Sequence, residues 1–203
     1  MRITKDPLVR KQEILETAMQ IFEEKGIQKT SMSDIANKAG VAKGLLYYYF
    51  ASKEALLNEV IEDLCTGVDE KIKGIMKDDR LDFYDKFGAI ISLFFYSIHE
   101  NPAIMNASPG NPGVFEFIKN KLSAIAIVHA LDLIELGIRN NYINIEYPEY
   151  VLRMLISGIA DLYVSGVTDP KVHTTLIEQT LGMERNKIRL GAVLEGQPAA
   201  KSS

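Results

Sequence analysis

The sequence predicts an all-α protein, and three observations support that class. Apolar residues recur every three or four positions over most of the chain, which is the period of an amphipathic helix. Apolar and polar residues alternate briefly at 142–145, but a single short run cannot build a sheet. The 203 residues are 47% apolar and 25% charged, a balance typical of a compact globular chain. We therefore expect eight to ten helices and a helical-bundle architecture.

The first two helices have clear start and stop signals. Asp6, as the N-cap before a first-turn proline, opens a helix over residues 7–25, and Gly26 supplies its C-terminal stop. Ser31 and Asp34 have the Ser-x-x-Asp spacing of a capping box, which starts a second helix of about two turns.

Two more helices follow a tight turn at Gly40. The third is expected from Lys43 to about Tyr49, and the fourth, which is longer, begins after a cap at Ser52. Two short helices joined by such a turn are the helix-turn-helix arrangement, whose second helix can enter the DNA major groove. The same spacing also fits a helical corner that never touches nucleic acid, so the spacing alone does not decide between them.

Longer helices with broader apolar faces are expected from about residue 80 onward. The turn-forming cluster at 107–113 and a bridge at 140–147 separate them, and Gly182 is a potential break in the last one. The helical segments predicted in this part of the chain are 81–99, 114–139, 148–166 and 170–183.

Charge is distributed unevenly along the chain. The net charge is −4, yet residues 1–53 hold nine Lys and Arg against six Asp and Glu, while residues 54–203 hold fourteen against twenty-one. A small basic module on an acidic body can face a polyanion. A surplus of three positive charges also fits an ordinary solvated surface.

Several classes of protein are not expected. The chain lacks the ~18 to 20 consecutive apolar residues of a membrane-spanning helix, and its first residues lack the apolar core of a signal peptide. A single cysteine, Cys65, permits no internal disulfide and fits a reducing cytosol, so we expect a cytoplasmic protein without membrane association. With one cysteine and three histidines, neither a structural zinc site nor another cofactor is expected.

The residues at the openings of the third and fourth helices point to an anionic partner. Lys53 lies in a first helical turn, where a cation opposes the helix dipole by about 0.3 to 1 kcal/mol, and a docked phosphate would reverse that sign. Lys43 occupies the equivalent position in the third helix. The four consecutive aromatics at 47–50 cannot all be buried by so short a corner, which leaves Tyr47 and Tyr48 free to donate to phosphate oxygens. The alternative, in which all four are core, fits the last two much better.

Residues 30–36, TSMSDIA, and 40–56, GVAKGLLYYYFASKEAL, resemble the DNA-binding signature of the TetR family of bacterial transcriptional regulators. The resemblance covers about residues 10–57. The sequence departs from the family pattern at Ala42, where a capping serine is frequent, and at Leu45, where a small polar residue is common. The first change weakens the helix cap, and the second offers an apolar side chain that can contact a thymine methyl group.

The resemblance implies a ligand-responsive transcriptional regulator, and we expect a repressor that a small, largely apolar or aromatic effector releases from double-stranded operator DNA. It implies a helix-turn-helix DNA-binding domain at 1–57, an effector-binding and dimerisation domain at 58–195, and a disordered tail at 196–203. It implies phosphate contacts from Thr30, Tyr47, Tyr48 and Lys53. It implies base-edge approach at Lys43, Gly44 and Leu45.

An effector cavity is expected between the helices of residues 81–139, lined by apolar and aromatic side chains with two histidines that can orient a ligand. An aromatic stripe at helical spacing is more often simply core. His129, Asp132 and Glu135 share a helix face, but a bundle di-iron site would need paired Glu-x-x-His motifs, which the sequence lacks. The candidate lining residues are Phe87, Ile91, Phe94, Tyr96, His99, Met105, Phe115, Ile125 and His129.

The resemblance also implies a homodimer in which the last two large helices pair with their copies. Intramolecular core is the rival interpretation for each residue of that face, and a helical interaction module or a bundle enzyme without DNA binding is the alternative function. No Gly-rich phosphate loop, His-Glu-x-x-His or Ser/His/Asp arrangement supports an enzyme. The candidate dimer residues are Leu152, Leu155, Ile156, Ile159, Tyr163, Val172, Leu176 and Met183.

Overall fold

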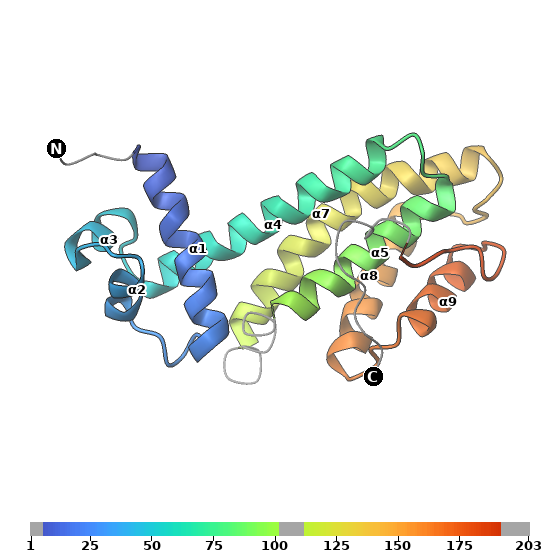
Figure 1. The fold of residues 1–203 in the computed structure, drawn as a ribbon. Helices are drawn as coiled ribbons and strands as arrows, with labels where there is room; N and C mark the ends of the chain where they lie inside the picture. The colour runs from blue at the N-terminus through green and yellow to red at the C-terminus, as the bar shows by residue number, and fades with distance from the viewer. Residues whose placement is uncertain (1–5, 102–111, 192–203) are drawn as a thin grey trace. The chain divides into compact units, whose positions relative to one another are not determined.

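The computed structural model describes residues 6–101 and 112–191, apart from the side chains at 98, 112–116 and 164 (Figure 1). Within these residues the chain forms eight helices and no strand, which confirms the all-α prediction. No helix in the described part of the chain is long and apolar enough to cross a membrane. The helices are α1 (Pro7–Lys25), α2 (Met32–Lys38), α3 (Lys43–Tyr49), α4 (Lys53–Lys77), α5 (Phe83–Glu100), α7 (Pro112–Arg139), α8 (Pro148–Val164) and α9 (Pro170–Thr180).

The chain divides into two compact units. The first comprises Met1–Gly67 with Glu100–Ile118, and the second comprises Val68–His99 with Lys119–Ser203. The sequence-based boundary between residues 57 and 58 falls inside α4, whose residues contribute to both units. The predicted tail at 196–203 lies outside the described residues.

The first helix begins and ends where the sequence predicts. The Asp6 carboxylate accepts hydrogen bonds from the backbone N–H groups of Leu8 and Val9, and Gly26 ends α1 with a φ of 80°. A side chain is strained at a positive φ of this size, so the glycine stops the helix. Helices α1, α2 and α3 form one helical group in the first unit (Figure 1). Its buried side chains include Ile14, Ala18, Phe22, Ile35, Ala36, Leu46, Phe50, Leu56 and Ile61.

The second unit has a core that joins α5, α7, α8 and α9. The bridge between α7 and α8 buries Ile143 in this core and forms no strand. Helix α9 ends at Thr180, before residue 183 and next to the break expected at Gly182, which adopts a φ of 62° and approaches the chain of the bridge closely. The fully buried side chains of this core include Leu133, Ile134 and Leu181.

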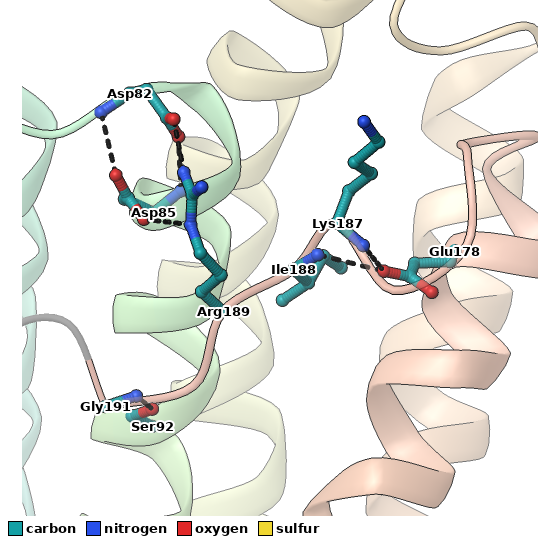
Figure 2. Close-up of polar contacts among 8 residues, drawn as sticks. All are labelled: Asp82, Asp85, Ser92, Glu178, Lys187, Ile188, Arg189 and Gly191. Atoms are coloured by element: carbon teal, nitrogen blue, oxygen red, sulfur yellow. Dashed lines mark hydrogen bonds and ion pairs between the residues drawn. The ribbon is translucent and has the colours of Figure 1, made fainter.

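The segment after α9 lies along α5 and is fastened to it by polar contacts (Figure 2). The Arg189 guanidinium pairs with Asp82 and Asp85, the latter at 2.7 Å between Nε and Oδ1. The buried Glu178 carboxylate accepts backbone N–H bonds at 2.8 to 2.9 Å from three residues of the same segment, Asn186, Lys187 and Ile188. We call residues 184–191 the C-terminal strap.

Candidate nucleic-acid interface

The helix-turn-helix is built by a short helix with a complete cap and a sharp turn. At its start, Ser31 Oγ accepts the Asp34 N–H while the Asp34 carboxylate accepts the Ser31 N–H, so the predicted capping box is present. At its end, Gly40 has a φ of 64°, and Val41 N–H donates to the Ala36 carbonyl over 3.0 Å. This turn at the C-terminal end of α2 changes the direction of the chain, which then continues into α3.

The two short helices are positioned by packing against neighbouring helices. Helix α1 packs against α2, and α2 packs against α3. Ala36 in α2 and Leu46 in α3 are both buried. One side of α3 is thereby committed to the interior of the first unit, as the sequence predicts for Leu46 and Phe50.

The opposite side of α3 faces solvent and carries the predicted reading residues. Tyr48 is 80% exposed, Tyr47 45% and Leu45 38%, although all three belong to residue types that are usually more buried. The ammonium of Lys43 lies 5.9 Å from the centre of the Tyr47 ring. We call the surface of Lys43, Gly44, Leu45, Tyr47 and Tyr48 the α3 face.

Gly44 leaves an open position on this face. A Cβ atom placed there would meet nothing within 4 Å. Packing inside the unit therefore does not explain why this position is a glycine, and its φ is not in the positive range that favours one. What remains is the absence of a side chain at the surface, which would let another molecule approach the helix backbone closely.

Thr30 and Lys53 have partners inside the first unit. Thr30 is buried and its hydroxyl donates to the carbonyl of Gly26 over 2.9 Å, so this hydroxyl already has a partner inside the unit. Lys53 is half-buried, and its ammonium donates to the carbonyls of Ile27 at 2.9 Å and Thr30 at 3.0 Å. An ammonium has three N–H donors, so one of them is not used by these two bonds.

The start of α3 lacks the side-chain cap that starts α2. Ala42 is the N-cap residue and makes no side-chain hydrogen bond, as expected from the alanine at this position. The first N–H groups of α3 therefore have no capping side chain there. Exposed helix N-terminal N–H groups attract anions.

The strongest electrostatic feature of this region is the Asp34 carboxylate. The Ser31 hydroxyl, the Ser31 backbone N–H and the Lys25 ammonium all donate to it, and together they lower its pKa from 3.8 to about 2. The capping box is therefore fully ionised at neutral pH, and it holds the helix that supports α3.

The predicted effector residues are only partly brought together. On α5, Phe87 is buried in the core of the second unit, whereas Ile91, Phe94 and Tyr96 are half-buried. The expectation that Phe87 lines an effector cavity stays a prediction. His99 is exposed, and Ile125 packs against a second core cluster that includes Leu93 and Ile72. Met105 and the side chain of Phe115 lie outside the described residues.

His129 has a partner on another helix. Its Nε2 lies 2.6 Å from Asp69 Oδ1, and this bond together with the Lys73 ammonium lowers the pKa of the Asp69 carboxyl. Asp132 and Glu135 are exposed on α7 and do not join the pair. In the described residues no group of three or more His, Cys, Asp or Glu side chains could hold a metal ion.

The predicted dimer face is turned inward over much of its length. Leu152 and Met183 are buried in the core of their own chain, because the most apolar stripe of an amphipathic helix packs against its own bundle first. The side of α8 that faces solvent instead carries Tyr150 and Met154, which are 67% and 75% exposed, and Val172 of α9 is also exposed. The remaining predicted residues, all half-buried, are Leu155, Ile156, Ile159, Tyr163 and Leu176.

Known regulatory proteins resemble this chain over the helix-turn-helix. Residues 14–60 match the model for bacterial regulatory proteins of the tetR family. The chain is 40% identical over 84 residues to the HTH-type transcriptional regulator YvdT of Bacillus subtilis, covering 41% of this chain and 43% of that protein. It is 28% identical over 158 residues to the HTH-type transcriptional repressor KstR2 of Rhodococcus jostii, covering 75% and 66% of the two chains.

The likeness extends to whole structures at low sequence identity. The structure of RolR without ligand superimposes with a TM-score of 0.67 at 16% identity, covering 95% of this chain and 100% of that one. At this identity the likeness shows the fold alone. The chain spans less than half the length of the first curated relatives that it matches, and the matched family model covers the helix-turn-helix rather than the second unit.

Proposed function

The chain belongs to the TetR family of bacterial regulatory proteins, and from this premise we propose that it is a ligand-responsive transcriptional repressor that binds double-stranded operator DNA through the α3 face. Regulators of this family bind operator DNA and act as dimers. A non-enzymatic role in the cytoplasm, where operator DNA lies, completes the proposal.

The observation that carries the proposal is the exposure of the α3 face. A short helix that buries Leu46 and leaves Leu45, Tyr47 and Tyr48 in water has apolar and aromatic surface that its own unit leaves exposed. Aromatic hydroxyls and a lysine beside a side-chain-free position suit the phosphates and base edges of a major groove. In this proposal Lys43 and Leu45 approach base edges.

The phosphate contacts are then shared between side chains and helix ends. Tyr47 and Tyr48 donate their phenol hydroxyls, and the uncapped N–H groups at the start of α3 face the backbone anion. The third N–H of Lys53 is available to a phosphate, while Thr30 contributes by shaping the turn that precedes α2.

A salt series on a duplex of random sequence tests this function. Affinity is expected to fall steeply as salt rises, because bound phosphates release counterions, and Lys53→Ala is expected to weaken binding and to reduce this salt dependence. Lys77→Ala removes an exposed lysine from the far end of α4 and serves as the matched control. The proposal is contradicted if the affinity does not fall as salt rises, or if the two variants lower it equally.

The partner chain is proposed to be a second copy that covers the solvent-facing side of α8 and α9. Tyr150, Met154 and Val172 offer exposed apolar surface, and Gly158 on α8 would meet nothing within 4 Å if it carried a Cβ, so two helices could approach closely there. Met154→Glu is expected to shift the protein toward monomer in sedimentation, whereas Glu135→Lys on α7 is expected to leave its assembly unchanged. A wild-type chain that is monomeric at micromolar concentration contradicts this part.

The proposed effector is a small, largely apolar or aromatic molecule that ends repression by a population shift. Helix α4 is continuous from Lys53 to Lys77 and contributes residues to both units. A ligand that displaces its second half therefore acts on the helix turn that carries Lys53. Effector and operator must then weaken each other's binding by the same factor, and independent binding contradicts the mechanism.

A further inference from the structure

Four aromatic side chains from three helices form a connected cluster in the second unit. The Phe95 ring of α5 lies 5.0 Å from the ring of His173 on α9 and 5.7 Å from that of Tyr163 on α8, measured between centres. Phe94 stands 5.7 Å from Phe95 and 6.4 Å from Tyr163. We call these four residues the aromatic cluster. Only Phe94 was expected from the sequence to contact a ligand.

One nitrogen of this cluster has a partner and the other does not. His173 is fully buried, and its Nε2 lies 2.6 Å from the carbonyl oxygen of Val167. A carbonyl oxygen can only accept, so Nε2 carries the hydrogen. In the neutral ring Nδ1 is then a bare acceptor, and it is buried without a hydrogen-bond partner.

A buried acceptor without a donor is rare in folded proteins, because it loses its hydrogen bonds to water on burial and gains none within the protein. The loss would be removed by a molecule that brings a donor to Nδ1. The surroundings suit an aromatic molecule, since Phe94, Phe95 and Tyr163 are each only half-buried and offer ring faces and edges.

We propose that the aromatic cluster is the effector site, in which His173 Nδ1 accepts a hydrogen bond from a neutral hydroxyl or N–H group of a small aromatic molecule. This inference rests on the proposed function, and it narrows the effector from apolar molecules in general to those with one hydrogen-bond donor. A carboxylate has no donor to offer when ionised and is not expected to bind the neutral ring.

The site also connects to the proposed dimer face. His173 belongs to α9 and is bonded to Val167 in the turn between α8 and α9, the two helices that carry the exposed apolar side chains. A ligand held by His173 therefore acts on the segment that fixes these helices to each other.

Phenol and toluene are matched probes, because they differ by a hydroxyl in place of a methyl group. Long-range proton–nitrogen correlation spectra of the full-length protein resolve the ring nitrogens of its three histidines. The free protein is expected to show His173 protonated at Nε2 with an unbonded Nδ1. Phenol is expected to move the Nδ1 resonance toward its hydrogen-bonded position, whereas toluene leaves it in place.

His173→Gln supplies the matched variant. Its amide N–H can still donate to the Val167 carbonyl, but nothing replaces Nδ1. Phenol is expected to bind this variant about three- to tenfold more weakly, the range of one hydrogen bond, with toluene affinity unchanged. If the variant does not fold, His99→Gln and His129→Gln each remove one set of ring-nitrogen signals, and the remaining set of the wild-type spectrum belongs to His173. The phenol and toluene titrations of the wild-type protein then test the proposal.

Three results overturn the proposal. The first is that Nδ1 of His173 is already hydrogen-bonded in the free protein. The second is that phenol does not bind, or binds without moving the Nδ1 resonance. The third is that benzoate binds and phenol does not. None of these depends on DNA, so failure of the site is distinguishable from failure of the regulator function, which the salt series measures separately.

Discussion

The ammonium of Lys53 donates to the carbonyl oxygen of Thr30 over 3.0 Å, and this bond ties the first turn of α4 to the segment that leads into α2. A second bond to the carbonyl of Ile27 reinforces it. The lysine expected to hold a phosphate therefore also positions the helix-turn-helix.

Replacing Lys53 by methionine keeps an unbranched apolar side chain, one atom shorter, and removes its donors. We expect a loss of about 1–3 kcal/mol in the free energy of unfolding of the first unit, because two carbonyls lose their donor in a half-buried place. The salt slope of binding to random duplex is expected to fall by about one. Urea unfolding and a salt titration measure the two effects, with Lys77→Met as control. An unchanged unfolding midpoint would mean that the bonds to Ile27 and Thr30 contribute nothing.

Part of this region could be predicted from the sequence, because its signals are local. The bounds of α1 follow from Asp6 and Gly26, and the end of α2 follows from Gly40, because caps and glycine turns act within one helical turn. The partners of Lys53 could not be predicted, since carbonyl oxygens are present at every residue and only the fold selects two of them.

Other features depend on contacts between distant segments. Arg189 bonds to Asp85 across 104 positions of sequence, and no pattern marks such a pair. The apolar stripe of α8 was identified correctly as a stripe, but periodicity does not say whether its own chain or a second copy covers it. The free nitrogen of His173 is likewise a property of packing. Composition gives no sign of it.

Ala42→Ser is expected to stabilise the protein. The serine hydroxyl can accept an N–H from the first turn of α3, where Ala42 now provides no side-chain bond, and such caps contribute about 0.5–2 kcal/mol. Chemical unfolding of the two proteins measures the gain. Ala42→Val, which offers no acceptor, should show no comparable increase, and equal effects of both substitutions would mean that capping is not the cause.

Gly88→Ala is expected to displace the C-terminal strap. A Cβ at this position would overlap the carbonyl oxygen of Arg189, a backbone atom that can move only with the strap. We expect a destabilisation of about 1–3 kcal/mol, the usual range for overpacking. Gly74→Ala in α4 meets open space and should instead stabilise by about 0.5–1 kcal/mol. Urea unfolding measures both changes. If Gly88→Ala and Gly74→Ala changed the free energy of unfolding in the same direction, the close approach of Gly88 and Arg189 would be contradicted.

The capping box of α2 is expected to weaken in acid. The folded pKa of Asp34 is about 2 and its ordinary value is 3.8, so the unfolded chain takes up the proton first as pH falls. The stabilisation from this group is complete above pH 3.8 and is lost as pH falls from there to about 2. Hydrogen exchange of the α2 amides measures this loss of stabilisation. Asp34→Asn should exchange faster than wild type at neutral pH, and this difference should shrink as pH falls through about 2, while Asp79→Asn should exchange like wild type.

The central claim is that two copies of the chain, related by two-fold symmetry, each place their α3 face in the major groove. Selection of bound sequences from a random duplex library tests it most directly. The account predicts enrichment of an inverted repeat whose half-sites lie about 10–10.5 base pairs apart or a multiple of that spacing, with the preference relaxed in Lys43→Ala. Recovery of no common sequence, or of a single unsymmetrical site that Lys43→Ala still selects, would contradict it.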